Sequence, residues 1–159
     1  MRVNIYGLRK NEDSLCTLVK ERGVNYSGKN EFNSPYLIRD LMEDVFHLSQ
    51  MPEEYVYLLC FGLQGKLHSV FEISHGAAAA SVCNSREILI RALLSNASFM
   101  VLVHNHPSGV PTPSGDDQKT TTCIRDAARL IGIPLRDHLI IADESYYSFA
   151  ENEPDLLGM

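Results

Sequence analysis

Residues 99–117 read FMVLVHNHPSGVPTPSGDD, and this stretch decides both the fold class and the candidate site. Its first five residues are all apolar, which is typical of a short strand buried on both faces of a sheet. His104 and His106 follow two positions apart, and residues at that spacing in extended chain point the same way, so both imidazoles can converge on one point. Three prolines then stiffen a loop that leads to a helix beginning at Ser114, with Asp117 in its first turn.

Two imidazoles and one carboxylate form a ligand set that suits zinc. Three protein ligands leave a fourth position for water, as in catalytic rather than structural zinc sites. Two other interpretations stay open. Ser114 and Asp117 also match a capping box, in which the carboxylate only holds the helix start, and the two histidines could be a hydrogen-bonded pair. The combination favours a metal, and capping is compatible with it because each carboxylate oxygen can do one of the two tasks.

The segments around this stretch predict a single α/β domain. The predicted elements are strands at 54–61 and 66–74, a helix capped by Ser85, a strand at 99–103, a helix from Ser114 that Gly132 ends, and strands at 139–141 and 146–149. The first two strands form a hairpin, because two glycines bracket the turn between them. This order describes a mixed β-sheet sandwiched by helices.

The first fifty residues look like an extension of that domain. Ser34 and Pro35 favour a helix start, with serine as the N-cap and proline at the first helical position. Apolar residues at helical spacing follow them. The expected division of the chain is an N-terminal extension over 1–50 with one amphipathic helix at about 34–50, a domain over 51–151, and a frayed tail over 152–159.

Length and composition fit one ordinary globular domain, since the chain has 159 residues, 45% of them hydrophobic and 21% charged. The net charge of −6 argues against broad, sequence-independent phosphate binding, which needs a cationic surface. The chain has no apolar stretch of roughly 18 residues and no signal-peptide pattern, so we expect a cytoplasmic protein. The four cysteines lie far apart and indicate reduced thiols, and Cys60, Cys83 and Cys123 are expected to be buried and inert.

The same residues resemble a known family. The spacing of His104, His106, Ser114 and Asp117 is similar to the JAMM (MPN+) metalloprotease motif, and the surrounding His-Asn-His-Pro-Ser-Gly resembles the RadC branch of that family. The resemblance covers about 53–149 and implies a single MPN/JAMM-like (cytidine-deaminase-like) domain.

This resemblance implies one catalytic zinc ion, held by His104, His106 and Asp117. It also implies a glutamate at the start of the first sheet strand that acts as general base. Matching the strand and its hairpin places this base at Glu54, with Glu53 as second choice because a one-residue slip would reverse the face. The Ser114 hydroxyl would help the metal to stabilise the oxyanion, with a plain N-cap as its alternative role.

The function implied is a zinc-dependent hydrolase acting on an amide bond of a peptide or isopeptide. The alternative is a RadC-type DNA-associated accessory protein without proteolytic activity. The acidic charge and the lack of a helix-hairpin-helix pattern in 1–50 argue against that alternative, so a nucleic-acid partner is not expected. A non-catalytic interaction module is a third class, and the intact ligand set argues against it. The sequence does not indicate an oligomeric state.

Two further features bear on the site. His138, beside Asp137 at a strand start, could support the metal ligands, although a structural histidine is the simpler interpretation. Ala77 to Ala80 stand where RadC relatives usually carry polar threonine and asparagine, so the substrate preference is open.

Overall fold

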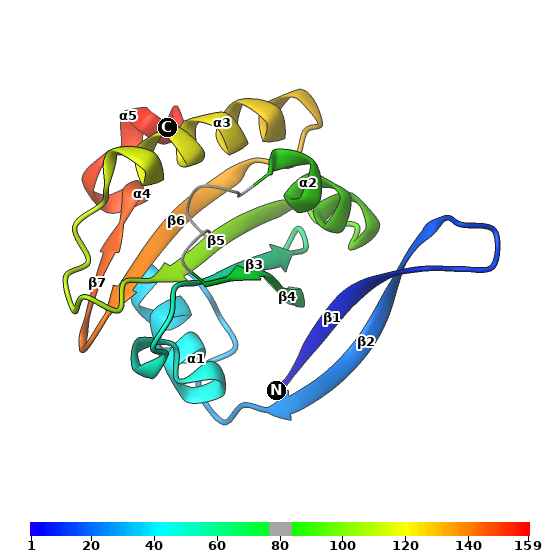
Figure 1. Cartoon of the computed structure of the whole chain (residues 1–159), viewed down its shortest axis with the longest axis horizontal. Coiled ribbons are helices and arrows are strands. Elements are labelled where there is room, and N and C mark those ends of the chain that lie inside the picture. The colour runs from blue at the N-terminus through cyan, green and yellow to red at the C-terminus, as the bar shows by residue number, and fades with distance from the viewer. Residues whose placement is uncertain (77–83) are drawn as a thin grey trace.

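The computed structural model describes residues 1–76 and 84–159 and is built on one seven-stranded mixed sheet (Figure 1). The strands lie in the order β2-β1-β4-β3-β5-β6-β7. Their bounds are β1 Arg2–Lys10, β2 Cys16–Asn25, β3 Tyr55–Phe61, β4 Leu67–His75, β5 Phe99–Asn105, β6 Leu135–Ala142 and β7 Ser145–Ser148. Helices cover both faces of this sheet, so the predicted fold class is confirmed.

Strand β5 lies inside the sheet, and all seven of its residues are buried. It pairs antiparallel with β3 on one side and parallel with β6 on the other. Burial on both faces explains the continuous apolar run that predicted the strand. Its antiparallel pairing with β3 begins at Val56 opposite His104, so the start of β3 lies beside the end of β5.

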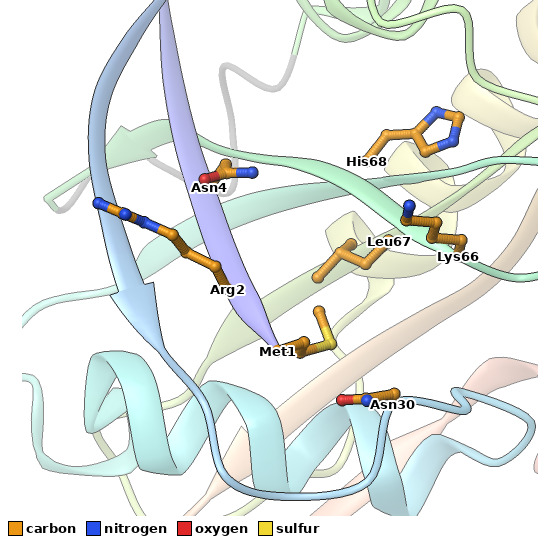
Figure 2. Close-up of a pocket in the computed structure, with 7 residues that line it drawn as sticks. All are labelled: Met1, Arg2, Asn4, Asn30, Lys66, Leu67 and His68. Atoms are coloured by element: carbon orange, nitrogen blue, oxygen red, sulfur yellow. The ribbon is translucent and has the colours of Figure 1, made fainter.

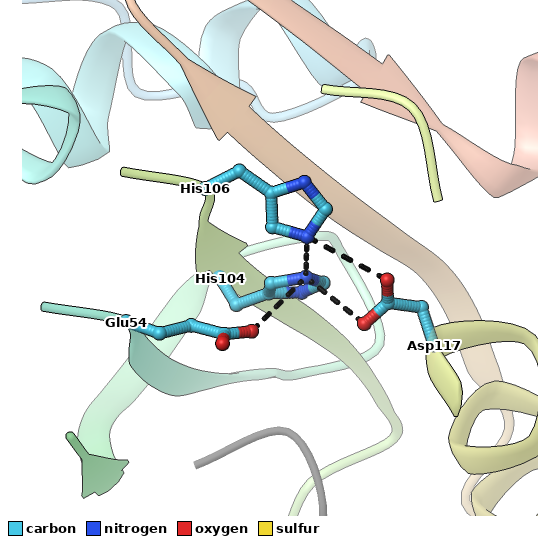
Figure 3. Close-up of side chains that lie close together, drawn as sticks. All are labelled: Glu54, His104, His106 and Asp117. Atoms are coloured by element: carbon cyan, nitrogen blue, oxygen red, sulfur yellow. Dashed lines mark hydrogen bonds and ion pairs between the residues drawn. The ribbon is translucent and has the colours of Figure 1, made fainter. Parts of the chain in front are cut away.

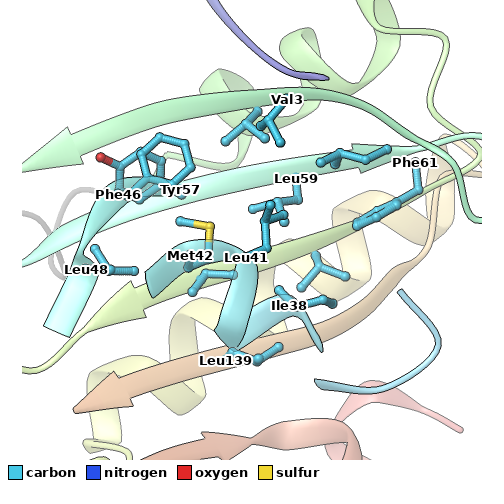
Figure 4. Packing of buried hydrophobic residues seen from close by; sticks show 14 of the residues in the cluster. Val3, Ile38, Leu41, Met42, Phe46, Leu48, Tyr57, Leu59, Phe61 and Leu139 are labelled. Carbon is cyan, nitrogen blue, oxygen red and sulfur yellow. The ribbon is translucent and has the colours of Figure 1, made fainter. Parts of the chain in front are cut away.

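Helix α1 (Pro35–Phe46) covers one face of the sheet and closes the first of two hydrophobic cores (Figure 4). Ser34 is its N-cap, with Pro35 at the first helical position, as predicted. Leu41 and Met42 are fully buried and point toward the sheet. The α-helix ends at Phe46, earlier than predicted, and the short 3-10 helix η1 (Leu48–Gln50) continues the chain toward β3.

The second core lies on the opposite face, under α2 (Ser85–Leu94), α3 (Gly115–Leu130), α4 (Phe149–Asn152) and α5 (Pro154–Leu157). The N-cap of α2 is Asn84, whose side chain accepts a hydrogen bond from the Arg86 amide at 3.0 Å. The sequence predicted Ser85 in that position, but Ser85 is the first residue of the helix. Both residue types are good N-caps, so their adjacency left the choice to the tertiary structure.

The N-terminal segment contains two strands that were not predicted. β1 and β2 form an antiparallel hairpin, and β1 joins the sheet in parallel beside β4, with Ile5 opposite Val70. Much of the hairpin projects away from the rest of the fold (Figure 1). Val3 and Ile5 are buried in the first core, but the other residues of the two strands are at least partly exposed. The apolar alternation typical of a strand is therefore confined to the start of β1.

The C-terminal segment also differs from the prediction, because residues expected to be frayed form α5. This helix contacts α3 and β6, and Leu157 is only 4% exposed. Leu157 is buried in the second core and Leu156 packs partly against it, and these two apolar side chains hold the C-terminal segment on the domain.

The cysteines have different environments. Cys60 is buried, and burial raises the pKa of its thiol to about 12. Cys16 and Cys123 are exposed, so the prediction of a buried Cys123 is wrong: this side chain lies on the outward face of α3. Cys83 and the four alanines at 77–80 lie outside the described residues. Within the described ranges, no helix is both long and apolar enough to cross a membrane.

Replacing a leucine on the inner face of α1 tests this packing. Leu41 is fully buried, whereas Leu130 in α3 is 89% exposed. Leu41→Ala should lower the free energy of unfolding by about 2–5 kcal/mol, because it removes buried methyl groups and leaves a cavity. Leu130→Ala should change it by less than about 0.5 kcal/mol. Urea denaturation measures both, and equal losses in the two variants would contradict the packing of α1 on the sheet.

Candidate metal centre

Strand β5 brings His104 and His106 to the same side of the sheet, close to the start of α3 (Figure 3). His104 is the second-to-last residue of β5. His106 follows the strand, and its amide continues the pairing with β6 by donating to the Ile141 carbonyl at 2.9 Å. Positions two apart in extended chain carry their side chains in the same direction. The Nε2 atoms of the two rings consequently lie 3.1 Å apart.

Asp117 and Glu54 complete a group of four side chains. Asp117 lies in the first turn of α3, with Oδ1 3.2 Å from His104 Nε2 and Oδ2 3.5 Å from His106 Nε2. Glu54 immediately precedes β3, and its Oε1 is 3.7 Å from His104 Nε2. One ligand atom from each of the four residues lies within 4.8 Å of the others. Among the residues that the structure describes, Glu54 belongs to this group and its neighbour Glu53 does not.

The separations between these atoms fit a metal ion. Zinc takes nitrogen and oxygen ligands at about 2.0–2.2 Å, so two ligands at a tetrahedral angle on one ion lie roughly 3.3 Å apart. The 3.1 Å between the ring nitrogens and the 3.2 Å from His104 Nε2 to Asp117 Oδ1 are close to that value. Imidazole nitrogens and carboxylate oxygens are ligands for zinc and for other borderline divalent ions. The group can therefore hold a metal ion.

The tautomer of His104 follows from a chain of buried hydrogen bonds. Thr121 Oγ1 lies 2.6 Å from the Asp117 carbonyl, which can only accept, so the hydroxyl proton is used there. His138 Nδ1, 2.6 Å from the same hydroxyl oxygen, must then be the donor. Burial lowers the pKa of His138 well below its usual range, so the ring is neutral and its Nε2 accepts from His104 Nδ1 at 2.8 Å. His104 thus turns an Nε2 lone pair toward the centre of the group.

His106 is oriented in the same way by a backbone carbonyl. Its Nδ1 lies 2.9 Å from the carbonyl oxygen of Val110, which leaves the Nε2 lone pair free to bind a metal. The loop between the two residues turns at Gly109, which has a positive φ of 79°. The positive φ favours glycine here, and a Cβ at this position would lie 2.7 Å from the Asp143 carboxylate, which would have to move.

The two imidazole lone pairs and the carboxylate oxygens are all hydrogen-bond acceptors, so a positive charge between them stabilises the group. The pKa values of its members are shifted in the direction that such a charge requires. Hydrogen bonding to Asp117 raises the pKa of His106 above its usual value. Burial alone would raise the pKa of Asp117, but the two imidazoles hold it well below its usual range. A metal ion can supply the required charge in place of a proton.

Ser114 is the N-cap of α3, and it shares a complete capping box with Asp117. Asp117 Oδ2 accepts from the Ser114 amide at 2.7 Å and from the Ser114 hydroxyl at 2.6 Å, while the hydroxyl oxygen accepts from the Asp117 amide at 3.1 Å. Oδ1 remains as the oxygen closer to His104. The carboxylate therefore caps the helix with one oxygen and offers the other to the centre of the group.

The sequence predicts only part of what lies behind the ligands. It favours a structural role for His138 over a supporting one, and in the structure His138 contacts His104 directly. For Thr121, which contacts His138, the sequence predicts no role. Its position four residues after Asp117 places both on one face of the helix, which is the sequence signal that could have identified it.

A cavity of about 640 Å³ lies elsewhere in the molecule (Figure 2). Its lining residues are Met1, Arg2, Asn4, Asn30, Lys66, Leu67 and His68. Leu67 begins β4, whereas His75, at the other end of that nine-residue strand, pairs with Tyr55 next to Glu54. Nine residues of strand span roughly 25–30 Å, so this cavity is separate from the candidate metal centre.

Comparison with known proteins agrees with this geometry. The sequence family described as RadC-like JAB domain matches residues 32–154. The chain belongs to this family. The matched region contains α1 as well as all four residues of the group in Figure 3.

Two curated relatives from bacteria illustrate the level of similarity. A UPF0758 protein of Streptococcus gordonii is 35% identical over 136 residues, which are 86% of this chain and 58% of that protein. A UPF0758 protein of Alkaliphilus metalliredigens is 38% identical over 111 residues, or 70% of this chain and 47% of that protein. The chain of this RadC-like JAB protein spans about half the length of the relatives it matches.

Removal of His138, which hydrogen-bonds to the Nδ1 of His104, should weaken metal binding although no ligand is changed. In His138→Phe, the His104 Nδ1 proton loses its acceptor, and we expect the zinc dissociation constant to rise about 10- to 100-fold. His68→Phe, which removes a histidine far from the group, should leave it unchanged. Competition with a chromophoric chelator measures both constants, and circular dichroism shows whether each variant is folded. Wild-type affinity in folded His138→Phe would contradict the role of the hydrogen-bond chain.

Proposed function

We propose that this protein is a zinc-dependent metallohydrolase that cleaves an amide bond in a peptide or isopeptide substrate. The position of Glu54 carries the proposal. The donor atoms of His104, His106 and Asp117 lie 3.1–3.5 Å from one another, whereas the Glu54 carboxylate is 3.7 Å from His104 Nε2. A carboxylate beside a set of three ligands is placed to handle a proton rather than to close the ligand set.

In this proposal, the ligands and the base have separate tasks. A zinc ion held by His104, His106 and Asp117 would supply a Lewis acid and lower the pKa of water toward about 7. Glu54 would accept a proton from water and deliver it to the leaving amine. Its side chain is 21% exposed, which leaves it in reach of both water and substrate. The buried hydrogen bonds behind His104 and Asp117 would keep the ligand atoms in place during this transfer.

Ser114 is proposed as a donor to the oxyanion that forms on the attacked carbonyl. Its hydroxyl lies at the edge of the group and donates to Asp117 Oδ2 at 2.6 Å. To stabilise an oxyanion, the hydroxyl would turn from this oxygen toward the substrate, while the Ser114 amide would continue to hold the carboxylate. Capping and catalysis would then depend on different atoms of the same residue.

Removal of the proposed base should abolish hydrolysis without removing the metal. With zinc-loaded protein and a panel of peptides and isopeptide-linked conjugates, Glu54→Gln should lower kcat by about 10²- to 10⁴-fold. Zinc content should stay at the wild-type level, because the three ligands are unchanged. His106→Ala should lose both zinc and activity.

Glu144→Gln is the matched control, because it removes an exposed carboxylate outside the group and should retain full activity. Zinc content measured by elemental analysis separates the two roles. Stoichiometric zinc in His106→Ala would refute the proposed ligand set. Metal-independent hydrolysis by the wild type would refute the proposed chemistry.

Two substitutions at Ser114 separate capping from catalysis. Ser114→Gly removes the hydroxyl but should lower the free energy of unfolding by only about a few tenths of a kcal/mol, because glycine is a tolerated N-cap. If Ser114 donates to the oxyanion, kcat should fall about 10²- to 10³-fold in this variant. Ser114→Thr keeps a hydroxyl and a cap and should retain most activity. Equal activity of the glycine and threonine variants would leave Ser114 with capping alone.

A further inference from the structure

Asn105 is the last residue of β5, lies between His104 and His106, and points to the other side of the strand. Neighbouring side chains of a strand leave opposite faces, so Asn105 does not share the direction of His104 and His106. It is fully buried. Its Oδ1 accepts from the amide of Tyr55 at 2.7 Å, and its Nδ2 donates to the carbonyl of Glu53 at 2.9 Å. Asn105 therefore binds the main chain on both sides of Glu54.

This contact has the hydrogen-bond pattern of a parallel β-bridge. In such a bridge, the N–H of one residue donates to the carbonyl before a residue of the neighbouring strand, and the C=O of that same residue accepts from the amide after it. The carboxamide of Asn105 makes the same two contacts around Glu54, with a side chain in place of the main chain. The backbone pairing of β3 with β5 ends at Val56 opposite His104. Beyond this last pair of the antiparallel ladder, the Asn105 side chain therefore adds a separate link to the main chain on either side of Glu54.

Glu54 is also held from β4. The amide of Gly76 donates to the Glu54 carbonyl at 2.9 Å. Asn105 on one side and Gly76 on the other hold the main chain at Glu54, directly after a bend at Pro52 and Glu53. In this conformation the Glu54 carboxylate lies 3.7 Å from His104 Nε2, and Glu53 is not part of the group.

The identity of the side chain matters because Asn105 is fully buried, its Oδ1 serves as an acceptor and its Nδ2 serves as a donor, with the Met51 carbonyl as a longer second acceptor at 3.5 Å. Aspartate is nearly the same size but has no N–H to give to the Glu53 carbonyl. Leucine has the same branched arrangement of side-chain heavy atoms, with larger methyl groups, and satisfies neither backbone group. A buried backbone group that loses its partner is unfavourable, so the segment around Glu54 would shift to find another one.

We propose that Asn105 is a positioning residue that sets the Glu54 carboxylate against the metal ligands. The inference rests on the proposed function, in which Glu54 is the base. Asn105 touches neither substrate nor metal in this role and acts through the backbone of Glu54. Its effect should therefore be on the position of the base and not on the affinity for the metal.

Asn105→Leu and Asn105→Asp test the role, with Ser69→Ala as the control. Ser69 is a buried polar residue of β4 that bonds Ser95, away from the candidate metal centre. In metal-free Asn105→Leu, the Tyr55 amide should exchange its hydrogen at least about tenfold faster, because its acceptor is gone. The amides of Leu58 and Leu59, in the middle of β3, should be unaffected. Zinc affinity should stay within roughly threefold of wild type, in contrast to His138→Phe.

A paramagnetic metal reports the position of Glu54 without any substrate. With Co²⁺ bound, the Glu54 side-chain carbons should show large paramagnetic shifts in the wild type and in Ser69→Ala. In Asn105→Leu, the shifts of Glu54 should fall while those of Asp117 persist. Asn105→Asp keeps the acceptor for Tyr55 and should give an intermediate shift. It also serves as the test variant if Asn105→Leu does not fold, with its Glu54 shift still expected below wild type.

Hydrolysis provides the final readout. Asn105→Leu should lower kcat by roughly 10²-fold with KM unchanged, as expected for a small misplacement of a catalytic group. In a Glu54→Gln background it should cause no further loss, because it acts through Glu54. Unchanged Glu54 shifts, zinc binding as weak as in His138→Phe, or losses that multiply in the double variant would each overturn the inference. If the wild type hydrolyses nothing, the proposed function fails, while the exchange and Co²⁺ measurements still decide the positioning role.

Discussion

Along β5, consecutive side chains leave opposite faces of a strand that is buried on both, and the arrangement of the candidate metal centre depends on this alternation. His104 and His106 face the start of α3, which supplies Asp117. Asn105, between them, faces the other way and holds the chain on either side of Glu54. β5 and the residue after it therefore position two ligands, and through Asn105 they also hold the backbone that carries the Glu54 carboxylate. The position of β5 inside the sheet, between β3 and β6, fixes its register from both sides.

The polar groups behind the ligands form a continuous path of hydrogen bonds. The path runs from the Asp117 carbonyl through Thr121 and His138 to His104 Nδ1, and the opposite ring nitrogen of His104, Nε2, lies 3.2 Å from the Asp117 carboxylate as a second acceptor. Buried polar groups are unfavourable unless they are paired, and here each donor meets an acceptor. Since every bond has a defined direction, the path also fixes which nitrogen of each ring carries the proton. The two metal-facing lone pairs are thus arranged by the fold before any ion binds.

The sequence predicted the fold where the local pattern and the tertiary environment agreed. The apolar run of β5, the hairpin of β3 and β4 and the amphipathic α1 each had a clear local pattern, and each is present, although α1 ends earlier than predicted. The hairpin of β1 and β2 has no predicted counterpart, because only Val3 and Ile5 of its residues are fully in the core and the remaining residues give no sustained alternation. Helix α5 has none for a similar reason, since Leu157 is its one buried side chain and Leu156 is only partly buried. Segments attached by so few apolar contacts carry little local signal.

The sequence by itself determined which ligands can meet: His104 and His106 are two apart in a strand, and Asp117 follows a short, proline-stiffened loop. These spacings are local, so the geometry of extended chain and of a helix start was enough to bring the three together. Only the tertiary structure decided the rest. The choice of Glu54 over Glu53, the support from His138 and Thr121, and the bridge from Asn105 all join residues that are distant along the chain. Such contacts depend on strand register and on which faces are buried, and the spacing of residues along the sequence determines neither of these.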